Sequence, residues 1–345
     1  METEITIEIF NQCSGSCTGC MLSLDERKVN TPSMSPKVFE FVIDKLISYG
    51  EDVGTIYRPV FVFGDFPAMD SFYKEKFLKV ISERNLKFGT TLTMVQENLE
   101  DQYYKTIERV VEIDESAILD YTIDPFRMLN DSKYIERVRK AVRMSPKFHM
   151  QILLSEAVIE RISPEDLSDL LRVSFGEVPT TLGFTPTLSN LDRKNYKFDV
   201  LSASDYTRRF FNSDKSLSQH LKRELERFSA EGDYTDFLKY GFHIGADSSV
   251  YPVSYTIFGD VILDKRNKGQ SLGRLISEDL PSILNSVKSN IISKSNDVYM
   301  GFGGFNCEDC SFYRSCKFNG VGLIRKTFKE FENKTGSCYG PISMV

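Results

Sequence analysis

Residues 5–20, ITIEIFNQCSGSCTGC, join an apolar, β-branched run to three closely spaced cysteines. The run Ile5–Phe10 predicts a β-strand that leads directly into the cysteine loop. Glycine and serine between Cys13, Cys17 and Cys20 let a short loop curl around one inorganic cluster and point backbone N–H groups at its sulfides. Cubane iron–sulfur clusters are usually held by four thiolates, so three leave one iron open to a substrate.

The residues alone leave two alternatives open for this loop. The three cysteines can be incidental, or they can hold zinc with a distant fourth ligand. The chain has only three histidines, none of them near the loop in sequence: His149, His220 and His243.

The seven cysteines fall into two groups, one near each end of the sequence. An odd number of cysteines fits a disulfide framework poorly, and segregated groups favour metal binding. The second group lies in a loop-rich tail and contains Cys307, Cys310, Cys316 and Cys338. Four thiolates close either a tetrahedral zinc site or a cubane cluster, and their spacing does not choose between the two.

Composition sets the broad class of the protein. The chain has 345 residues, of which 41% are hydrophobic and 27% charged, as in a well-packed globular protein. The net charge of −6 argues against a nucleic-acid surface. Neither a secretory signal nor an apolar run of about 18 residues is present, so we expect a cytoplasmic protein without a membrane partner.

Short apolar runs alternate with amphipathic segments through the first half of the chain. Such alternation predicts right-handed parallel crossovers, hence a parallel barrel or an open parallel sheet. No Gly-x-Gly-x-x-Gly follows the first strand, which disfavours a dinucleotide-binding fold. We expect strands at 5–10, 60–63, 88–95, 117–123, 148–154 and 181–186, and helices at 36–48, 69–83, 99–111, 133–144 and 164–171.

The pattern changes after this repeat. Residues 203–232 predict a long charged helix, and short strands and turns follow it. We therefore expect a barrel domain at 1–202, a connecting helix at 203–234 and a small cysteine-rich α+β domain at 235–345.

The three-then-two cysteine spacing, placed directly after the first strand of a βα repeat, resembles the radical S-adenosylmethionine (SAM) superfamily. The resemblance implies a partial (β/α)6 TIM-like barrel and a [4Fe–4S] cluster on Cys13, Cys17 and Cys20. The open iron then binds the methionine group of SAM, and an electron from a donor such as flavodoxin or ferredoxin cleaves SAM to a 5′-deoxyadenosyl radical. The family usually has an aromatic residue before the third cysteine, where this chain has Gly19. Phe10 or Met21 are the substitutes we consider for the adenine contact.

Two further segments extend this resemblance. Gly64-Asp65-Phe66-Pro67 resembles the Gly-Gly-Glu-Pro turn that hydrogen-bonds the methionine amino group of SAM. Alternatively, Asp65 is a helix N-cap with Pro67 in the first turn. Thr122 and Asp124 resemble a Ser-x-Asp segment near the ribose of SAM, although many strands end in Asp for turn reasons alone.

Other polar positions give weaker signals. Thr185 follows the sixth expected strand, and its assignment to the SAM site is the weakest of these. We interpret His149 as a packed, hydrogen-bonded histidine, not as a catalyst. The sequence assigns no catalytic acid or base.

The tail is similar to the SPASM domain, an extension that carries auxiliary [4Fe–4S] clusters in radical SAM enzymes. The family run Cys-x2-Cys-x5-Cys-x3-Cys has Gly320 at its fourth position here. Val253 and Ser254 lie where the entry hairpin is expected to carry a cysteine. The resemblance thus implies one auxiliary cluster on the four tail cysteines, with zinc as the alternative.

Many enzymes of this layout modify peptides or proteins by hydrogen abstraction. We therefore expect a peptide or protein substrate that acquires a crosslink or an oxidised residue, as in peptide natural-product maturation. The first cysteine at position 13 leaves no room for a leader-binding domain before the barrel, so a separate protein or the tail itself is expected to recognise the peptide. The alternatives are a small-molecule enzyme of cofactor or natural-product biosynthesis and a non-catalytic metal-binding scaffold, the latter favoured by Gly19 and Asp65.

Overall fold

The structure is a computed structural model. It describes residues 2–10, 12–13, 32–62, 64–176, 182–186, 200–213, 242–252, 255–256, 259–260 and 271–284. Of the seven predicted cluster ligands, Cys13 is described. The other six lie outside the described residues: Cys17, Cys20, Cys307, Cys310, Cys316 and Cys338.

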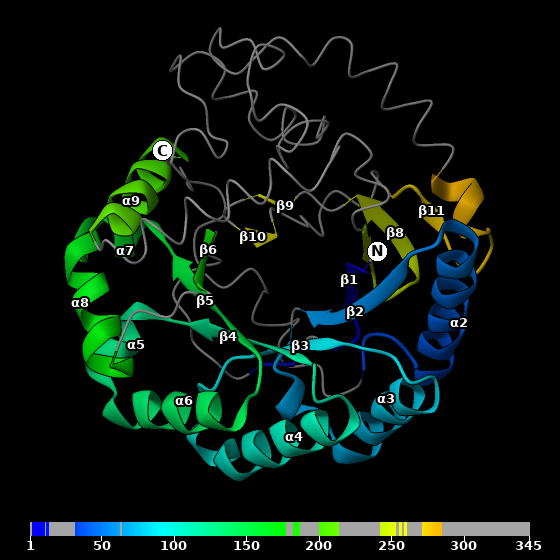
Figure 1. Cartoon of the computed structure of the whole chain (residues 1–345), viewed down its shortest axis with the longest axis horizontal. Coiled ribbons are helices and arrows are strands. Elements are labelled where there is room, and N and C mark those ends of the chain that lie inside the picture. The colour runs from blue at the N-terminus through cyan, green and yellow to red at the C-terminus, as the bar shows by residue number, and fades with distance from the viewer. Residues whose placement is uncertain are drawn as a thin grey trace, which may run out of the picture.

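Six parallel strands follow one another in chain order, which confirms the predicted partial (β/α)6 barrel (Figure 1). Every predicted strand is present: the strand at 148–154 has the predicted bounds, and the others differ by one to four residues at an end. The strands are β1 (Glu2–Glu8), β2 (Ile56–Val62), β3 (Gly89–Leu92), β4 (Ile118–Ile123), β5 (Phe148–Leu154) and β6 (Leu182–Pro186).

Helices lie outside the curved sheet and connect the strands (Figure 1). All five predicted helices are present: α2 (Pro36–Val53), α3 (Ser71–Glu83), α4 (Glu100–Ile113), α6 (Ser132–Met144) and α8 (Pro164–Phe175). Side-chain caps begin several of them, since Ser35 accepts a hydrogen bond from the N–H of Val38 and Asp70 from that of Phe72. Short elements that the periodicity did not predict are α5 (Pro125–Asn130), α7 (Glu156–Arg161) and the 3₁₀ turns η1 (Phe66–Ala68) and η2 (Glu97–Leu99).

One described helix overlaps the start of the expected connecting helix. Helix α9 spans Val200–Asn212, and residues 214–241 lie outside the described part of the chain. Beyond them, β7 (Phe242–Ile244) pairs in parallel with β1. Antiparallel strands β8 (Ser249–Pro252) and β11 (Gly273–Arg274) follow outward from β7, and β9 (Tyr255–Thr256) with β10 (Gly259–Asp260) forms a separate hairpin. The described chain beyond residue 241 therefore begins by extending the barrel sheet itself.

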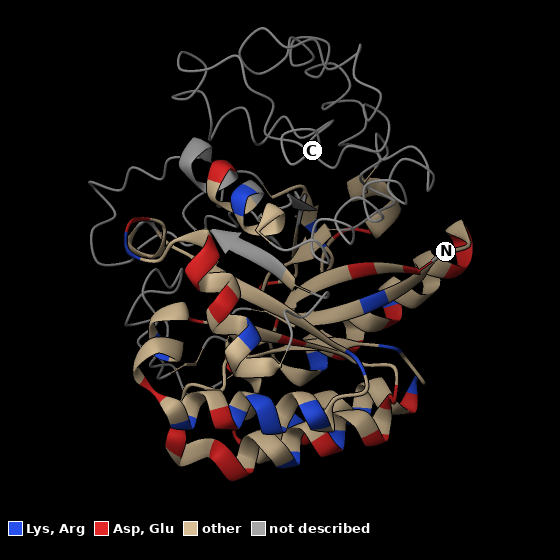
Figure 2. Cartoon of the chain, turned by 60° about the vertical axis from the view of Figure 1, so that its left-hand side comes forward, with Lys and Arg blue, Asp and Glu red and all other residues tan. Residues whose placement is uncertain are grey.

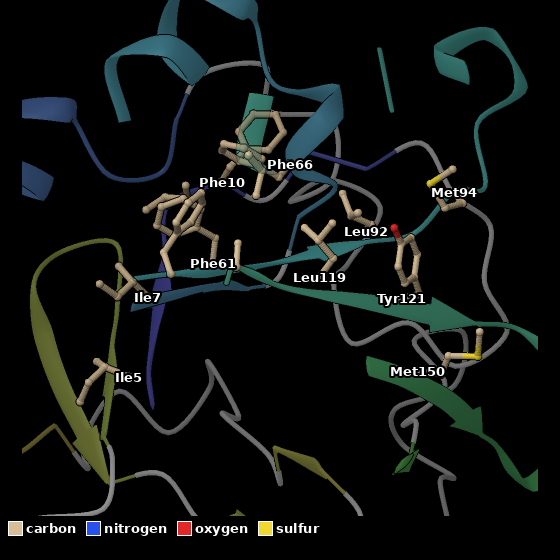
Figure 3. Close-up of a cluster of buried hydrophobic side chains, with 14 of the residues drawn as sticks. Ile5, Ile7, Phe10, Phe61, Phe66, Leu92, Met94, Leu119, Tyr121 and Met150 are labelled. Carbon is tan, nitrogen blue, oxygen red and sulfur yellow. The ribbon is translucent and has the colours of Figure 1, made fainter. Parts of the chain in front are cut away.

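The hydrophobic core lies between the sheet and the helices. Alternate residues of each strand point outward into it, among them Ile5, Phe61 and Tyr121 (Figure 3). The intervening residues face the inside of the barrel, and several are polar, such as Thr91 and Asp120. Acidic and basic side chains are interspersed along the outer helices (Figure 2). Among the described helices, none combines the length and the hydropathy needed to cross a bilayer.

Candidate functional site

The start of the predicted cysteine loop, at Gln12 and Cys13, lies beside the predicted SAM-binding turn. Because β1 and β2 are parallel neighbours, their carboxyl ends meet at the same edge of the sheet. The N–H of Asp65 donates a hydrogen bond to the carbonyl of Gln12 at 3.0 Å, directly before Cys13. A Cβ added to Gly64 would lie 2.2 Å from the carbonyl oxygen of Phe10, so only glycine permits this approach.

The Asp65 side chain points into the protein and is fully buried. The phenol of Tyr103 and the Gln96 amide, at 3.1 Å, both donate to Oδ2. The Thr93 N–H donates to Oδ1 at 3.3 Å. Burial raises the pKa of Asp65 and these hydrogen bonds oppose the rise. Asp65 occupies the N-cap position of η1, as the capping alternative predicts. Its carboxylate makes no capping hydrogen bond, so the side chain does not act as a cap.

Burial raises the pKa of the Tyr103 phenol, and the nearby Asp65 carboxylate raises this pKa further. The phenol therefore keeps its proton and donates a hydrogen bond. The same hydroxyl lies 3.3 Å from Thr93 Oγ1 and accepts from the Gln96 N–H at 3.3 Å. One phenol of α4 therefore joins the ends of β2 and β3.

Lys74 of α3 supports the other end of the turn. Its ammonium donates to the Pro67 carbonyl at 2.9 Å and to Thr106 Oγ1 at 3.1 Å. Burial lowers the pKa of Lys74, and the Asp65 carboxylate opposes this shift. The turn is thus fixed at Asp65 and at Pro67 by side chains from two helices.

The loop after β3 carries backbone strain at Met94, a non-glycine residue with φ of 54°. Its carbonyl accepts a hydrogen bond from Arg137 Nε of α6 at 3.1 Å. Strained backbone of this kind persists where its surroundings hold it, and it is common near functional sites.

Three supporting side chains were not predicted from the sequence: Lys74, Tyr103 and Arg137. Each lies on the buried face of its helix, among apolar residues. The sequence signal that could have identified them is a polar residue at a position where the helical periodicity predicts burial. A buried polar side chain needs a hydrogen-bond partner, so such a residue indicates a specific contact.

Asp124 ends β4 as a helix cap. Its Oδ1 accepts from the Phe126 N–H at 3.0 Å, its Oδ2 lies 3.9 Å from Arg127 Nε, and the residue is 4% exposed. The Thr122 carbonyl accepts from the Tyr134 hydroxyl at 3.2 Å. The turn interpretation of Asp124 is therefore confirmed, and its contact with a ribose stays a prediction.

Replacement of Asp124 by alanine is expected to lower the free energy of unfolding by about 0.5–2 kcal/mol, because the first turn of α5 loses its cap. Asp124→Ser keeps a capping oxygen and should retain most of that stability. Urea unfolding of the two variants measures this difference. If Asp124→Ala unfolds at the wild-type urea concentration, the capping role is wrong.

Polar side chains of β4 and β5 form a block on the inward face of the sheet, which we call the inner polar block: Asp120, Thr122, His149 and Gln151. Asp120 is in register with His149, and Thr122 with Gln151. His149 Nδ1 lies 2.8 Å from Gln151 Nε2 and 3.4 Å from Asp120 Oδ1. His149 is hydrogen-bonded as expected, but its side chain is 39% exposed and so it is not packed away.

A second inward histidine joins β7 to β1. His243 is buried, and its Nδ1 lies 3.0 Å from Thr6 Oγ1. Its Nε2 lies 3.9 Å from Glu8 Oε2. This histidine thus links the strand that precedes the cysteine loop to the post-barrel chain.

Of the proposed ligands of the first cluster, Cys13 is the one that the described residues place beside the turn. Cys13 is half-buried just past the carboxyl end of β1, next to Gln12, whose carbonyl accepts the hydrogen bond from Asp65. Among the described residues, no group of three or more His, Cys, Asp or Glu side chains gathers to hold a metal ion. Phe10 is 2% exposed in the core, which leaves no ring surface for an adenine, and Met21 lies outside the described residues.

Comparison with known proteins identifies the fold. No protein-family model matches the sequence, and no curated protein matches it either. Native anSMEcpe with bound AdoMet superposes with a TM-score of 0.55 at 16% identity, covering 96% of each chain. Streptococcus suis SuiB bound to S-adenosylmethionine gives a TM-score of 0.52 at 11% identity, over 92% of this chain and 73% of that chain. The chain therefore shares the fold of two proteins whose structures hold S-adenosylmethionine.

Proposed function

We propose that this chain is a radical SAM enzyme with one auxiliary iron–sulfur cluster. The observation that carries the proposal is the junction of the Cys13 loop with the Gly64–Pro67 turn at the carboxyl edge of the barrel. The shared fold with S-adenosylmethionine-bound structures supports it. When bound, the cluster supplies an electron that cleaves SAM to a 5′-deoxyadenosyl radical.

The residues of the chain have distinct roles in this proposal. Cys13, Cys17 and Cys20 hold the SAM-binding cluster. The Gly64–Pro67 turn holds the methionine end of SAM, and Thr122 with Asp124 borders its ribose. The tail holds the auxiliary [4Fe–4S] cluster through Cys307, Cys310, Cys316 and Cys338. Flavodoxin or ferredoxin is the kind of electron donor we expect, in a cytoplasmic setting.

We propose a peptide or protein substrate, as the SPASM-like tail implies. The inner polar block supports this choice, because Asp120 and His149 offer hydrogen-bonding groups inside the barrel. Along β4, Asp120 precedes Thr122 by two residues, or about 7 Å of strand. Asp120 and its register partner His149 thus lie one step deeper in the barrel than Thr122, the proposed ribose contact. A separate protein that presents the peptide remains part of the proposal.

Iron and zinc content, measured together with 5′-deoxyadenosine formation after anaerobic dithionite reduction, tests the proposal. About eight irons per chain are expected, four for each cubane cluster, with deoxyadenosine formed from SAM. About four irons with one zinc would keep the enzyme but replace the auxiliary cluster by a structural zinc site. Absence of both iron and deoxyadenosine after reconstitution would refute the proposal and favour a scaffold.

His149→Gln is expected to uncouple SAM cleavage from substrate modification. The substitution removes the imidazole from the inner polar block while leaving the cysteine loop and the Gly64–Pro67 turn in place. Deoxyadenosine formation without substrate should stay within about twofold of wild type, whereas modified product should fall at least tenfold, as for loss of one positioned group. Mass spectrometry of substrate and deoxyadenosine checks both. Equal loss of both products would place His149 in SAM binding instead.

A further inference from the structure

We propose that Asp65 is a positioning residue that does not touch SAM. Together with Tyr103 and Gln96 it forms a buried clamp, defined by these three side chains, which fixes the main chain of Gly64–Pro67 beside the Cys13 loop. This inference rests on the proposed function and changes the role that the Gly-Gly-Glu-Pro resemblance gives to the acidic residue. The ammonium of SAM is then bound by main-chain oxygen of the turn.

The Asp65 carboxylate is already committed to partners inside the protein. Its side chain has no exposed surface, and hydrogen bonds from Tyr103 and Gln96 both reach Oδ2. Rotation toward a ligand would break these bonds and leave a phenol and an amide buried without that acceptor. Leaving buried donors unsatisfied is more costly than losing an average hydrogen bond.

The clamp joins separate elements of the barrel. Asp65 follows β2, Gln96 follows β3 and Tyr103 lies in the first half of α4. The carboxylate therefore fixes the distance between the ends of two neighbouring strands. On its other side, the N–H of Asp65 bonds the carbonyl of Gln12, so the same residue also fixes the turn to the cysteine loop.

Within the described part of the chain, one carbonyl of the turn differs from the others in receiving no hydrogen bond. The Asp65 and Phe66 carbonyls accept hydrogen bonds from Ala68 and Met69, and the Pro67 carbonyl accepts one from Lys74. No hydrogen bond from the described residues reaches the Gly64 carbonyl. This oxygen is the one we assign to the ammonium.

A double-mutant cycle on the reconstituted holoenzyme tests the clamp. The dissociation constant of SAM is measured by calorimetry for wild type, Asp65→Asn, Tyr103→Phe and the double variant. The change that SAM causes in the electron paramagnetic resonance spectrum of the reduced cluster is a second measurement, independent of turnover. Each single variant is expected to weaken SAM binding roughly tenfold or more, since a charge-assisted hydrogen bond is lost. The double variant should bind no more weakly than Asp65→Asn, because both substitutions break one unit.

Two controls separate positioning from general destabilisation. Tyr104→Phe also removes a tyrosine–carboxylate hydrogen bond from α4, the one to Glu100 at 3.0 Å, and should leave SAM affinity unchanged. Ile107→Val weakens the packing of the same helix, where Ile107 is fully buried, and should lower the melting temperature without changing affinity.

Several results would overturn the inference. Wild-type affinity in Tyr103→Phe with loss in Asp65→Asn would show a direct contact between the carboxylate and SAM. Additive losses in the double variant would show two independent roles, and wild-type affinity in Asp65→Asn would show that the turn needs no clamp. If wild-type holoenzyme itself fails to bind SAM, the proposed function is wrong and this inference falls with it.

Discussion

Cys17→Ala is expected to abolish 5′-deoxyadenosine formation, the largest effect of any single substitution in this chain. Loss of one of three thiolates leaves the SAM-binding cubane with two protein ligands, which is too few to hold it. The iron content should fall from about eight to about four atoms per chain, because the four tail cysteines keep their own cluster. Iron analysis and an anaerobic deoxyadenosine assay measure both quantities.

The matched variant for this experiment is Cys310→Ala in the tail. It should lose the auxiliary cluster while keeping cleavage of SAM in the absence of substrate. Full deoxyadenosine formation by Cys17→Ala would contradict the assignment of the first cysteine group. Loss of all iron in Cys17→Ala would show that the two groups do not load independently.

Gly64→Ala is expected to have the second largest effect, through sterics alone. The new methyl group would lie 2.2 Å from the Phe10 carbonyl oxygen, which is backbone and has no rotamer to escape into. The turn must therefore move away from the cysteine loop, which breaks the hydrogen bond from Asp65 to Gln12. We expect SAM affinity to fall by at least a hundredfold, as for about 3 kcal/mol of lost binding free energy. Calorimetry of the reconstituted variant measures this loss.

Gly54→Ala is the matched control for Gly64→Ala. Gly54 has a φ of +69° and no atom within 4 Å of an added Cβ, so alanine there costs backbone strain without a clash. It should lower stability by about 1–2 kcal/mol and leave SAM affinity unchanged. Equal loss of affinity in the two variants would mean that Gly64 acts through global stability and not through the junction.

The barrel could be predicted from the sequence because its signals are local. Apolar runs such as Val60–Phe63, separated by amphipathic stretches, predict strands and helices, and the handedness of parallel crossovers then fixes their order. The junction of β1 and β2 followed from that order, since parallel strands bring their carboxyl ends to one edge. The short helices α5 and α7 were missed because each has too few turns for a periodic pattern.

The orientation of Asp65 could not be predicted, because it depends on partners far away in sequence. Tyr103 lies 38 residues further along the chain and Gln96 lies 31 residues further. A motif match identifies the position of an acidic residue at a turn but not the side to which its carboxylate points. The same limit applied to His149, whose exposure depends on which face of β5 meets the interior.

The pairing of β7 with β1 has a consequence for the order in which this protein forms during synthesis. Strand β1 leads into the proposed cluster loop, yet its second neighbour is Phe242–Ile244, more than two hundred residues later. Until that segment leaves the ribosome, β1 has an unpaired edge on one side, and open strand edges invite pairing with other chains. The sheet around β1 is therefore completed only late in translation, and the proposed cluster site gains its supporting strand at the same late stage.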